Sequence, residues 1–176
     1  MIVFLRKRLT VAESTLSELA SSIAKKAHEG QVDKAGFEYI HHPRRVAAHA
    51  EIARLELAPH LDSHEVASVA WLHDVVEDTY ITLVDLAELG FPRNVLLAVE
   101  LLTHEGDVGR DVYMDAIETD ELATIVKYAD TLDNTDPVRV ALLAQSDPEK
   151  AKKLSQKYAG QMARLKLAIQ VHQRHL

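Results

Sequence analysis

Four ionisable side chains lie within six residues in one stretch of the chain, His73, Asp74, Glu77 and Asp78. The residues just before them, 66–72, are almost entirely apolar, as in a helix that is buried on all sides. Charges in such a place are costly unless they are paired, hydrogen-bonded or bound to a metal ion. A solvated acidic helix end with one core histidine is the alternative, but it does not explain the apolar residues. The stretch therefore predicts a functional polar site at the end of a buried helix.

The spacing of these residues indicates what chemistry the site would support. On a continuous helix, His73 would lie over Glu77, and Asp74 would lie over both Glu77 and Asp78. Histidine nitrogen and carboxylate oxygen form a ligand set that Mn, Fe and Zn accept in proteins. Further carboxylates beside such an ion would position a water molecule or accept its proton. The stretch thus predicts part of a metal-dependent site, with other ligands supplied from elsewhere in the chain.

Two other positions are candidates for the missing ligands. Asp130 lies on the apolar face of a predicted helix, where a carboxylate is costly unless it binds a cation or caps a helix. His42 directly precedes Pro43 at a helix entrance, and its neighbour His41 is an equal candidate on this reasoning. Five further histidines show no pattern and are interpreted as surface or structural residues: His28, His49, His104, His172 and His175.

The composition predicts a helical protein with a sizeable core. The chain has 176 residues, is 47% hydrophobic, and contains only 6 glycines and 5 prolines, which favours helices over sheets. It has no cysteine, so disulfides and thiol chemistry are excluded, and a cytoplasmic location is the simplest expectation. No stretch is long and apolar enough to span a bilayer. With a net charge of −7 and no basic stripe, the chain is not expected to bind nucleic acid, whereas a small phosphorylated nucleotide stays compatible with it.

Apolar periodicity and capping residues predict the order of the elements. We expect an N-terminal tail or short extended segment over 1–10, followed by a single all-α domain of about eight helices over 11–176. A loop of about a dozen residues is expected between Gly30 and Pro43, a length at which loops are often functional. Self-association is left open by the sequence. The predicted helices cover about 11–27, 43–57, 62 onward through the charged cluster, 82–90, 92–102, 110–118, 122–136, 138–145 and 148–173.

Four segments of the chain together resemble a known family. They read AHEGQ at 27–31 with Lys34 and Gly36 after it, YIHHP at 39–43, LHDVVEDT at 72–79 and KYADTLDN at 127–134. The order His, His-Asp, Asp is similar to that of the HD superfamily of metal-dependent phosphohydrolases. The closest resemblance is to the hydrolase domain of RelA/SpoT-type proteins and to stand-alone small alarmone hydrolases.

The resemblance implies a role for each matching residue. One divalent ion, in this family usually manganese, would be held by His42, His73, Asp74 and Asp130, although Fe, Zn or Co would also suit these ligands. Glu77 and Asp78 would orient and activate the attacking water. The substrate-binding residues would be Lys34, Tyr39, Lys127 and Asn134. The reaction implied is removal of pyrophosphate from the 3′ position of guanosine tetra- or pentaphosphate.

Three residues depart from the family pattern and keep other functions open. Asp33 stands where the family often has a basic residue, Glu38 where it often has proline, and Thr131 where it often has Arg or Lys. Two of these changes remove a cation beside a highly anionic ligand. Hydrolysis of a nucleoside mono- or triphosphate is therefore one alternative, and a nucleotide-binding sensor without turnover is another. The Glu77-Asp78 pair argues against the sensor, which has no need of a water-activating acid.

Overall fold

The computed structural model of the chain describes residues 15–33, 36–104, 106 and 108–174. The predicted tail over 1–10, the predicted helix start at 11–14 and Lys34 all lie outside these residues. Within them the regular structure is helical apart from one isolated antiparallel bridge between Val32 and Glu38, so the all-α prediction is confirmed. The helices are α2 (Leu16–Ala27), α3 (His41–Leu57), α4 (Ser63–Leu72), α5 (Val75–Asp78), α6 (Leu83–Glu88), α7 (Arg93–Leu102), α8 (Arg110–Glu118), α9 (Glu121–Asn134), α10 (Pro137–Ser146) and α11 (Pro148–Gln173).

Local capping chemistry explains why most helices begin where they do. The side chain of Asp147 accepts a hydrogen bond from the Lys150 backbone N–H, and Pro148 follows as the first residue of α11. Asp62 caps α4 by accepting from the Glu65 backbone N–H at 3.0 Å. Glu65 stands three residues after Asp62, the spacing of a capping box, but its carboxylate accepts a hydrogen bond from Asn94 instead. A contact between distant helices has replaced a local one.

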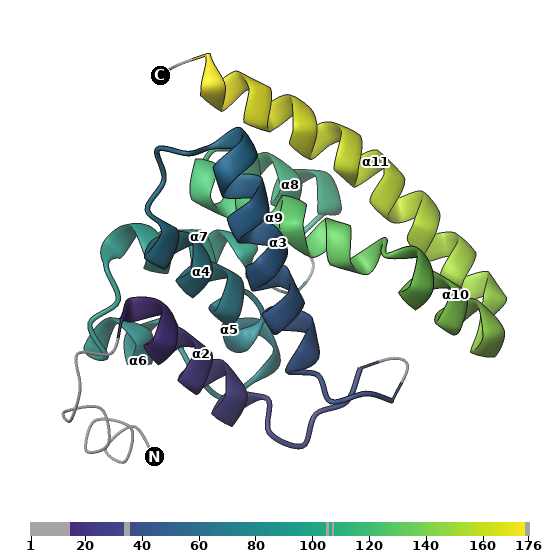
Figure 1. The fold of residues 1–176 in the computed structure, drawn as a ribbon, viewed down its shortest axis with the longest axis horizontal. Coiled ribbons are helices and arrows are strands. Elements are labelled where there is room, and N and C mark those ends of the chain that lie inside the picture. Colours follow the sequence, from purple (N-terminus) through teal and green to yellow (C-terminus); the bar gives the residue numbers. More distant parts are fainter. Residues whose placement is uncertain (1–14, 34–35, 105, 107, 175–176) are drawn as a thin grey trace.

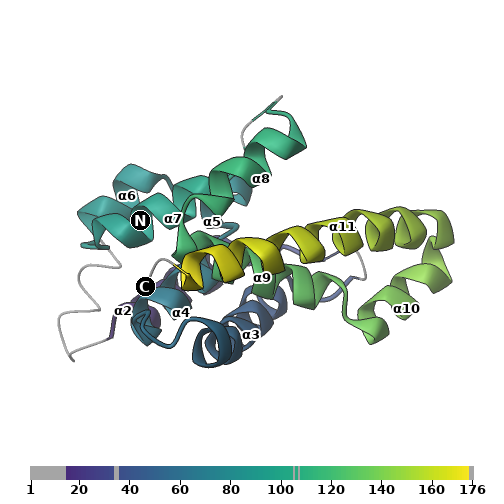
Figure 2. The same ribbon diagram turned by 90° about the horizontal axis from the view of Figure 1, so that it is seen from above.

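The core lies between α3, α4 and α9, which pack against one another, while α2 covers another side of α4 (Figure 1). Buried residues such as Val46, Val69, Leu72 and Ile125 fill the space between them. The long helix α11 runs along α9 and pairs with α10, as both views show (Figure 1, Figure 2). Because α3, the end of α4 and α9 meet in the core, side chains at those points are held by rigid elements.

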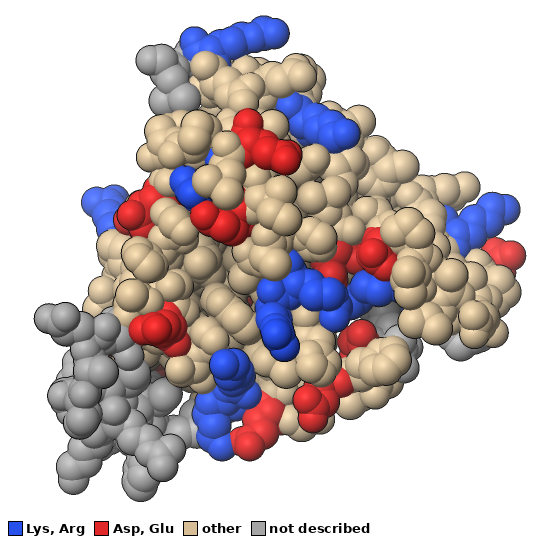
Figure 3. Space-filling model, viewed as in Figure 1, with Lys and Arg blue, Asp and Glu red and all other residues tan. Residues whose placement is uncertain are grey.

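The remaining predictions about the chain as a whole concern its surface and its surroundings. Within the described residues, no helix combines the length and hydrophobicity that a bilayer span requires. Basic and acidic side chains are interspersed on the face drawn in Figure 3. The cytoplasmic location, the single domain over 11–176 and the state of association stay predictions.

Candidate metal centre

The charged cluster lies at an interruption between two helices and not on one continuous helix, so that prediction is wrong. Helix α4 ends at Leu72, His73 and Asp74 form the junction, and α5 is a single turn from Val75. On an unbroken helix, adjacent side chains point about 100° apart. The junction instead brings His73 Nε2 within 3.0 Å of Asp74 Oδ2, so both neighbours face the same point.

Two more side chains reach that point from distant parts of the chain. His42, in the first turn of α3, places its Nε2 atom 3.3 Å from His73 Nε2 and 3.5 Å from Asp74 Oδ2. Asp130 on α9 places Oδ1 at 3.3 Å from His42 Nε2 and 4.0 Å from His73 Nε2. His41 is half exposed and faces Glu38 instead. The structure therefore brings together the four predicted ligands and distinguishes His42 from His41.

The hydrogen bonds behind the two rings leave their inner nitrogens available to a cation. His73 Nδ1 lies 2.8 Å from the Ala70 carbonyl oxygen, which can only accept, so Nδ1 carries the proton. His42 Nδ1 lies 2.7 Å from Asp133 Oδ2. Both Nε2 lone pairs then point into the cluster. Ligands about 2.0–2.2 Å from one ion are themselves roughly 3–3.5 Å apart. The ring nitrogens lie 3.0–4.0 Å from the Asp74 and Asp130 oxygens, and the atoms of His42, His73 and Asp74 are all within 4.8 Å of one another. The residues present fit a divalent ion.

The charges around the cluster favour a cation as well. Burial alone would lower the pKa of His42, but hydrogen bonds to Asp130, Asp133 and Asp74 raise it well above the ordinary value. Burial alone would raise the pKa of Asp74, yet the His73 and His42 rings hold it well below its usual range. Asp74 and Asp130 thus flank a point at which positive charge is stabilised, and Asp133 adds to this from behind the His42 ring.

Two of the predicted substrate-binding residues contact Asp130. Lys127 Nζ lies 3.1 Å from Asp130 Oδ2, and Asn134 Nδ2 donates to Asp130 Oδ1 at 2.5 Å. The pKa of Lys127 is raised: burial alone would lower it, but the Asp130 charge outweighs burial. Lys127 therefore compensates the charge of Asp130 from one side, and both residues also line the cleft above the cluster.

Tyr39 touches the cluster through its hydroxyl group. The hydroxyl donates to Asp74 Oδ2, and the ring packs on His28 with centroids 4.8 Å apart. Burial and the Asp74 carboxylate both raise the pKa of Tyr39, so the hydroxyl stays protonated and remains a donor. The other predicted residue of this loop, Lys34, lies outside the described residues.

The two predicted catalytic acids are exposed on α5 and line the same cleft. Glu77 Oε2 accepts a hydrogen bond from the His104 backbone N–H at 2.8 Å. The Asp78 carbonyl oxygen accepts from Gln31 Nε2 at 3.0 Å. Burial and the Asp74 charge raise the pKa of Asp78, which makes its carboxylate a better proton acceptor than an ordinary aspartate. Each acid is thus attached to a segment outside its own helix.

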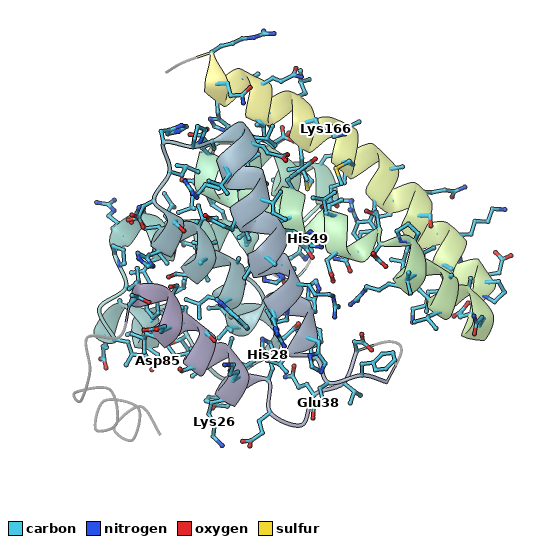
Figure 4. The ribbon with its side chains drawn as sticks, viewed as in Figure 1. Lys26, His28, Glu38, His49, Asp85 and Lys166 are labelled. Carbon is cyan, nitrogen blue, oxygen red and sulfur yellow. The ribbon has the colours of Figure 1, made fainter. Side chains whose placement is uncertain are left out.

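Two histidines interpreted as surface or structural residues lie beside the site. His28 is 2% exposed, and its Nδ1 lies 2.8 Å from Gln31 Oε1. In Figure 4 it lies between the end of α2 and the start of α3, whereas the neighbouring Lys26 points outward. The His104 side chain lines the cleft and packs edge-on against Tyr113. Neither residue shows a periodic signal, because both sit where helices give way to loops.

Asp133 and Arg45 contact the site but were not predicted as site residues. Asp133 is 1% exposed and bonds both His42 and Arg45. A signal for them exists in the spacing, because Arg45 is three residues after His42 and Asp133 three residues after Asp130, so each pair shares a helix face. The spacing does not show that these two helix faces pack against each other.

The cluster forms one wall of a cleft of about 950 Å³, within the range of small-molecule sites. Three arginines line it: Arg45, Arg110 and Arg139. Aromatic and aliphatic side chains complete the lining: Phe37, Tyr113, Tyr158, Leu142, Leu143 and Leu154. The cleft therefore combines an acidic, histidine-rich patch with cations and an apolar wall.

Comparisons with known proteins agree with this description. No protein-family model matches the chain. A guanosine-3′,5′-bis(diphosphate) 3′-pyrophosphohydrolase of Haemophilus influenzae is 50% identical over 66 residues, which are 38% of this chain and 9% of that protein. The bifunctional (p)ppGpp synthase/hydrolase SpoT of Escherichia coli K12 is 40% identical over 78 residues, 44% of this chain and 10% of that protein. The matched part spans about a tenth of the length of these curated relatives.

A solved structure extends the likeness to almost the whole fold. It is described as a metazoan ortholog of SpoT that hydrolyses ppGpp, and it has a TM-score of 0.58 with 23% sequence identity. The alignment covers 94% of this chain and 97% of that one. The resemblance predicted from the motifs is thereby confirmed: the chain has the helical HD-domain fold and is similar in sequence to SpoT-type (p)ppGpp hydrolases.

Proposed function

We propose that the chain is a metal-dependent phosphohydrolase that removes pyrophosphate from the 3′ position of guanosine 3′,5′-bis(diphosphate). The observation that carries this proposal is the convergence of His42, His73, Asp74 and Asp130 from three segments, with two further acids on the same cleft. The names of the matched relatives support the choice of substrate. The described activity of the structural neighbour supports it as well.

The four converging side chains would hold one divalent ion. Manganese is the proposed ion, and Fe, Zn or Co would fit the same two-histidine, two-carboxylate set. When bound, the ion would offset negative charge on the reacting phosphate and lower the pKa of a water molecule. The chain contributes the orientation of its ligands, because each histidine is held at Nδ1 by a fixed acceptor.

The exposed acids on α5 would handle the protons of the reaction. Glu77 or Asp78 would accept a proton from the attacking water. The water oxygen forms a bond to the phosphorus next to the ribose O3′ atom, the bond from phosphorus to O3′ breaks, and O3′ takes up a proton. Tyr39 would hold Asp74 in place during this step by donating to its Oδ2 atom.

The rest of the cleft would bind the nucleotide. The apolar wall on α10 and α11 offers Leu142 and Tyr158 as a surface for a base. Arg110 lines the cleft and donates to the neutral Gln161 side chain, and among the described residues no carboxylate pairs with it. Its charge would therefore meet a phosphate group, together with Lys34 of the opening loop. Asn134 and Lys127 border the reacting end through Asp130.

A nucleotide panel tests the proposal. The protein is incubated with guanosine tetraphosphate, guanosine triphosphate and guanosine monophosphate, each with Mn²⁺, Zn²⁺ or Mg²⁺, and both phosphate and pyrophosphate release are measured. We expect pyrophosphate from the tetraphosphate with Mn²⁺. The combined Glu77→Gln and Asp78→Asn variant should keep its metal and lose turnover by at least about 100-fold, the usual contribution of a positioned base. No pyrophosphate from the tetraphosphate with any ion would reject the substrate assignment.

One observation favours a second candidate, hydrolysis of a nucleotide that carries fewer phosphates. Two of the three cleft arginines are already compensated, because Arg139 lies 3.3 Å from Asp133 and 3.8 Å from Asp33, and Arg45 is bonded to Asp133. A highly anionic ligand would find less positive charge here than the number of arginines suggests. The same panel decides between the two, and tight binding without any product would instead indicate a sensor.

A further inference from the structure

Asp133 is a buried carboxylate that touches the metal centre without facing it. It is 1% exposed and lies on α9, one turn after Asp130. Its Oδ2 atom is 2.7 Å from His42 Nδ1, the ring nitrogen opposite the one that points into the cluster. Asp133 therefore lies behind the His42 ring, on the side away from the converging atoms.

The other contacts of Asp133 leave it no room to act as a ligand. Arg45 Nε donates to Oδ1 at 2.6 Å and Arg45 Nη2 to Oδ2 at 3.2 Å, while Arg139 Nη1 lies 3.3 Å from Oδ2. With the His42 ring, three of these contacts fall on Oδ2 and one on Oδ1, so donors behind the His42 ring engage both carboxylate oxygens. The arginines also compensate a buried charge that would otherwise be costly.

We propose that Asp133 is a positioning residue that sets the orientation and the donor strength of His42, and thereby the affinity of the centre for its metal ion. The proposal rests on the proposed function only in requiring that the centre binds a divalent ion. It does not depend on which nucleotide is the substrate. Asp133 accepts a hydrogen bond from His42 Nδ1–H, and this fixes the ring so that the Nε2 lone pair points toward the ion. A charged hydrogen-bond acceptor makes the imidazole a stronger metal ligand than a neutral acceptor does.

The contrast with His73 shows what Asp133 adds. The partner of His73 Nδ1 is the neutral carbonyl oxygen of Ala70, three residues earlier in the last turn of α4. The partner of His42 Nδ1 is a charged side chain on another helix, itself fixed by arginines from α3 and α10. The hydrogen bond that orients His73 joins residues close in the sequence, whereas the one that orients His42 depends on the contact between α3 and α9. A change at Asp133 should therefore weaken metal binding without altering any ligand.

The test compares metal affinity in three variants by competition with a chromogenic chelator, using Zn²⁺ and Mn²⁺ alone as probes. Asp133→Asn keeps the size of the side chain and removes its charge. Arg45→Gln removes two bonds to Asp133 but leaves the bond to His42. Asp136→Asn is the matched control, because it makes the same chemical change three residues away at the α10 N-cap, where Asn caps as well as Asp.

We expect Asp133→Asn to weaken metal binding by about 10- to 100-fold, the usual effect of losing a partner of a ligating histidine. Arg45→Gln should weaken it several times less, and Asp136→Asn should leave it unchanged. Thermal unfolding of the metal-free proteins is measured in parallel. If Asp133→Asn binds metal as tightly as the unmodified protein, or no more weakly than Arg45→Gln, the proposal is overturned.

A spectroscopic measurement separates positioning from a merely structural role. In the zinc-loaded protein with ¹⁵N-labelled histidine, the His42 Nδ1 proton should resonate far downfield because it is shared with a carboxylate. In Asp133→Asn this resonance should move upfield while that of His73 stays in place. An unchanged His42 resonance would contradict the proposal. Failure of the nucleotide panel with both results as expected would reject the substrate and leave the role of Asp133 intact.

Discussion

The two halves of the candidate metal centre are held by different kinds of interaction. His73 and Asp74 are neighbours in the sequence and are placed by the junction between α4 and α5 together with a backbone carbonyl. His42 and Asp130 come from helices far apart in the sequence, and the link between them runs through side chains, including His42–Asp133 across 91 residues. One half is therefore local and the other depends on long-range packing.

The difference teaches where the site is robust and where it can be tuned. A backbone acceptor cannot be removed by a substitution, so the hydrogen bond that orients His73 is fixed, whereas Asp74 also accepts from the replaceable Tyr39 side chain. The long-range half has replaceable supports, Asp133, Arg45 and Arg139, which line or adjoin the cleft. Substitutions of these supports would lower the affinity for the metal ion by graded amounts and leave the candidate ligands in place.

The largest effect is expected when a ligand is removed from the local half of the centre, which consists of His73 and Asp74. Asp74→Ala should lose its metal on purification and lose turnover by at least about 1,000-fold, because the ion contributes both charge and an activated water molecule. Metal content by mass spectrometry and the pyrophosphate assay measure this. Asp111→Ala, whose carboxylate is 97% exposed on α8, is the control. Retained metal in Asp74→Ala would mean that the long-range half suffices to bind the ion.

A smaller effect is expected where Asp78, one of the two proposed catalytic acids, is bonded to Gln31 in the loop between α2 and α3. Gln31→Leu removes the hydrogen bonds to the Asp78 carbonyl and to His28. The free energy of unfolding should fall by about 1 kcal/mol, and kcat should fall by roughly 10-fold with unchanged metal affinity, since a small misplacement of a catalytic group can cost up to about 100-fold.

Gln173→Leu is the matched control for this effect, because Gln173 Nε2 also donates to a backbone carbonyl, that of Leu57, at 2.7 Å. It should cost similar stability and leave kcat unchanged. An equal loss of kcat in both variants would show that Gln31 acts on the fold and not on α5.

The smallest effect is expected for a partly exposed carboxylate on α3, Glu51, that is also bonded to an arginine. Glu51 accepts from Arg54 Nε and Nη2, each at 2.8 Å, and the hydrogen bond to Arg54 lowers the pKa of Glu51. A lowered pKa adds stability above the unfolded value of 4.5, and this contribution is lost as the pH falls through the lower folded value.

Glu51→Gln should therefore destabilise the protein by less than about 1 kcal/mol near neutral pH, and the difference should shrink in acid below the folded pKa. Urea unfolding near neutral pH and at a pH below the folded pKa of Glu51 measures this difference in the free energy of unfolding. A difference that grows in acid would have the wrong sign for this carboxylate. Comparing the stability of this variant with that of Asp133→Asn contrasts a partly exposed carboxylate–arginine pair with a buried one.

Much of the fold could be predicted because its signals are local. The Asp147-Pro148 start and the end of α11 near Gln173, and the end of α3 near Leu57, agree with the structure. Two local expectations failed for the same reason. Glu65 contacts Asn94 on α7, and at the α4–α5 junction His73 and Asp74 meet His42 of α3; periodicity contains neither contact.

The four candidate ligands could be named in advance because buried charge next to apolar residues is costly, and because their order matches a known motif. The residues behind them could not. The spacing puts Asp133 on the helix face of Asp130 but does not show what that face contacts, and His28 shows no pattern at all. Their partners lie on other helices, so their roles appear only when the helices are packed.

Residue types, apolar spacing and caps were enough to establish an all-α chain and the kind of chemistry at its centre, because helix formation and the cost of burying charge act over a few residues. The packing of the helices established which nitrogen of His42 faces the cluster and which arginines are already paired. These are distances between atoms dozens of residues apart, and such distances are set by how the hydrophobic faces of the helices fit together.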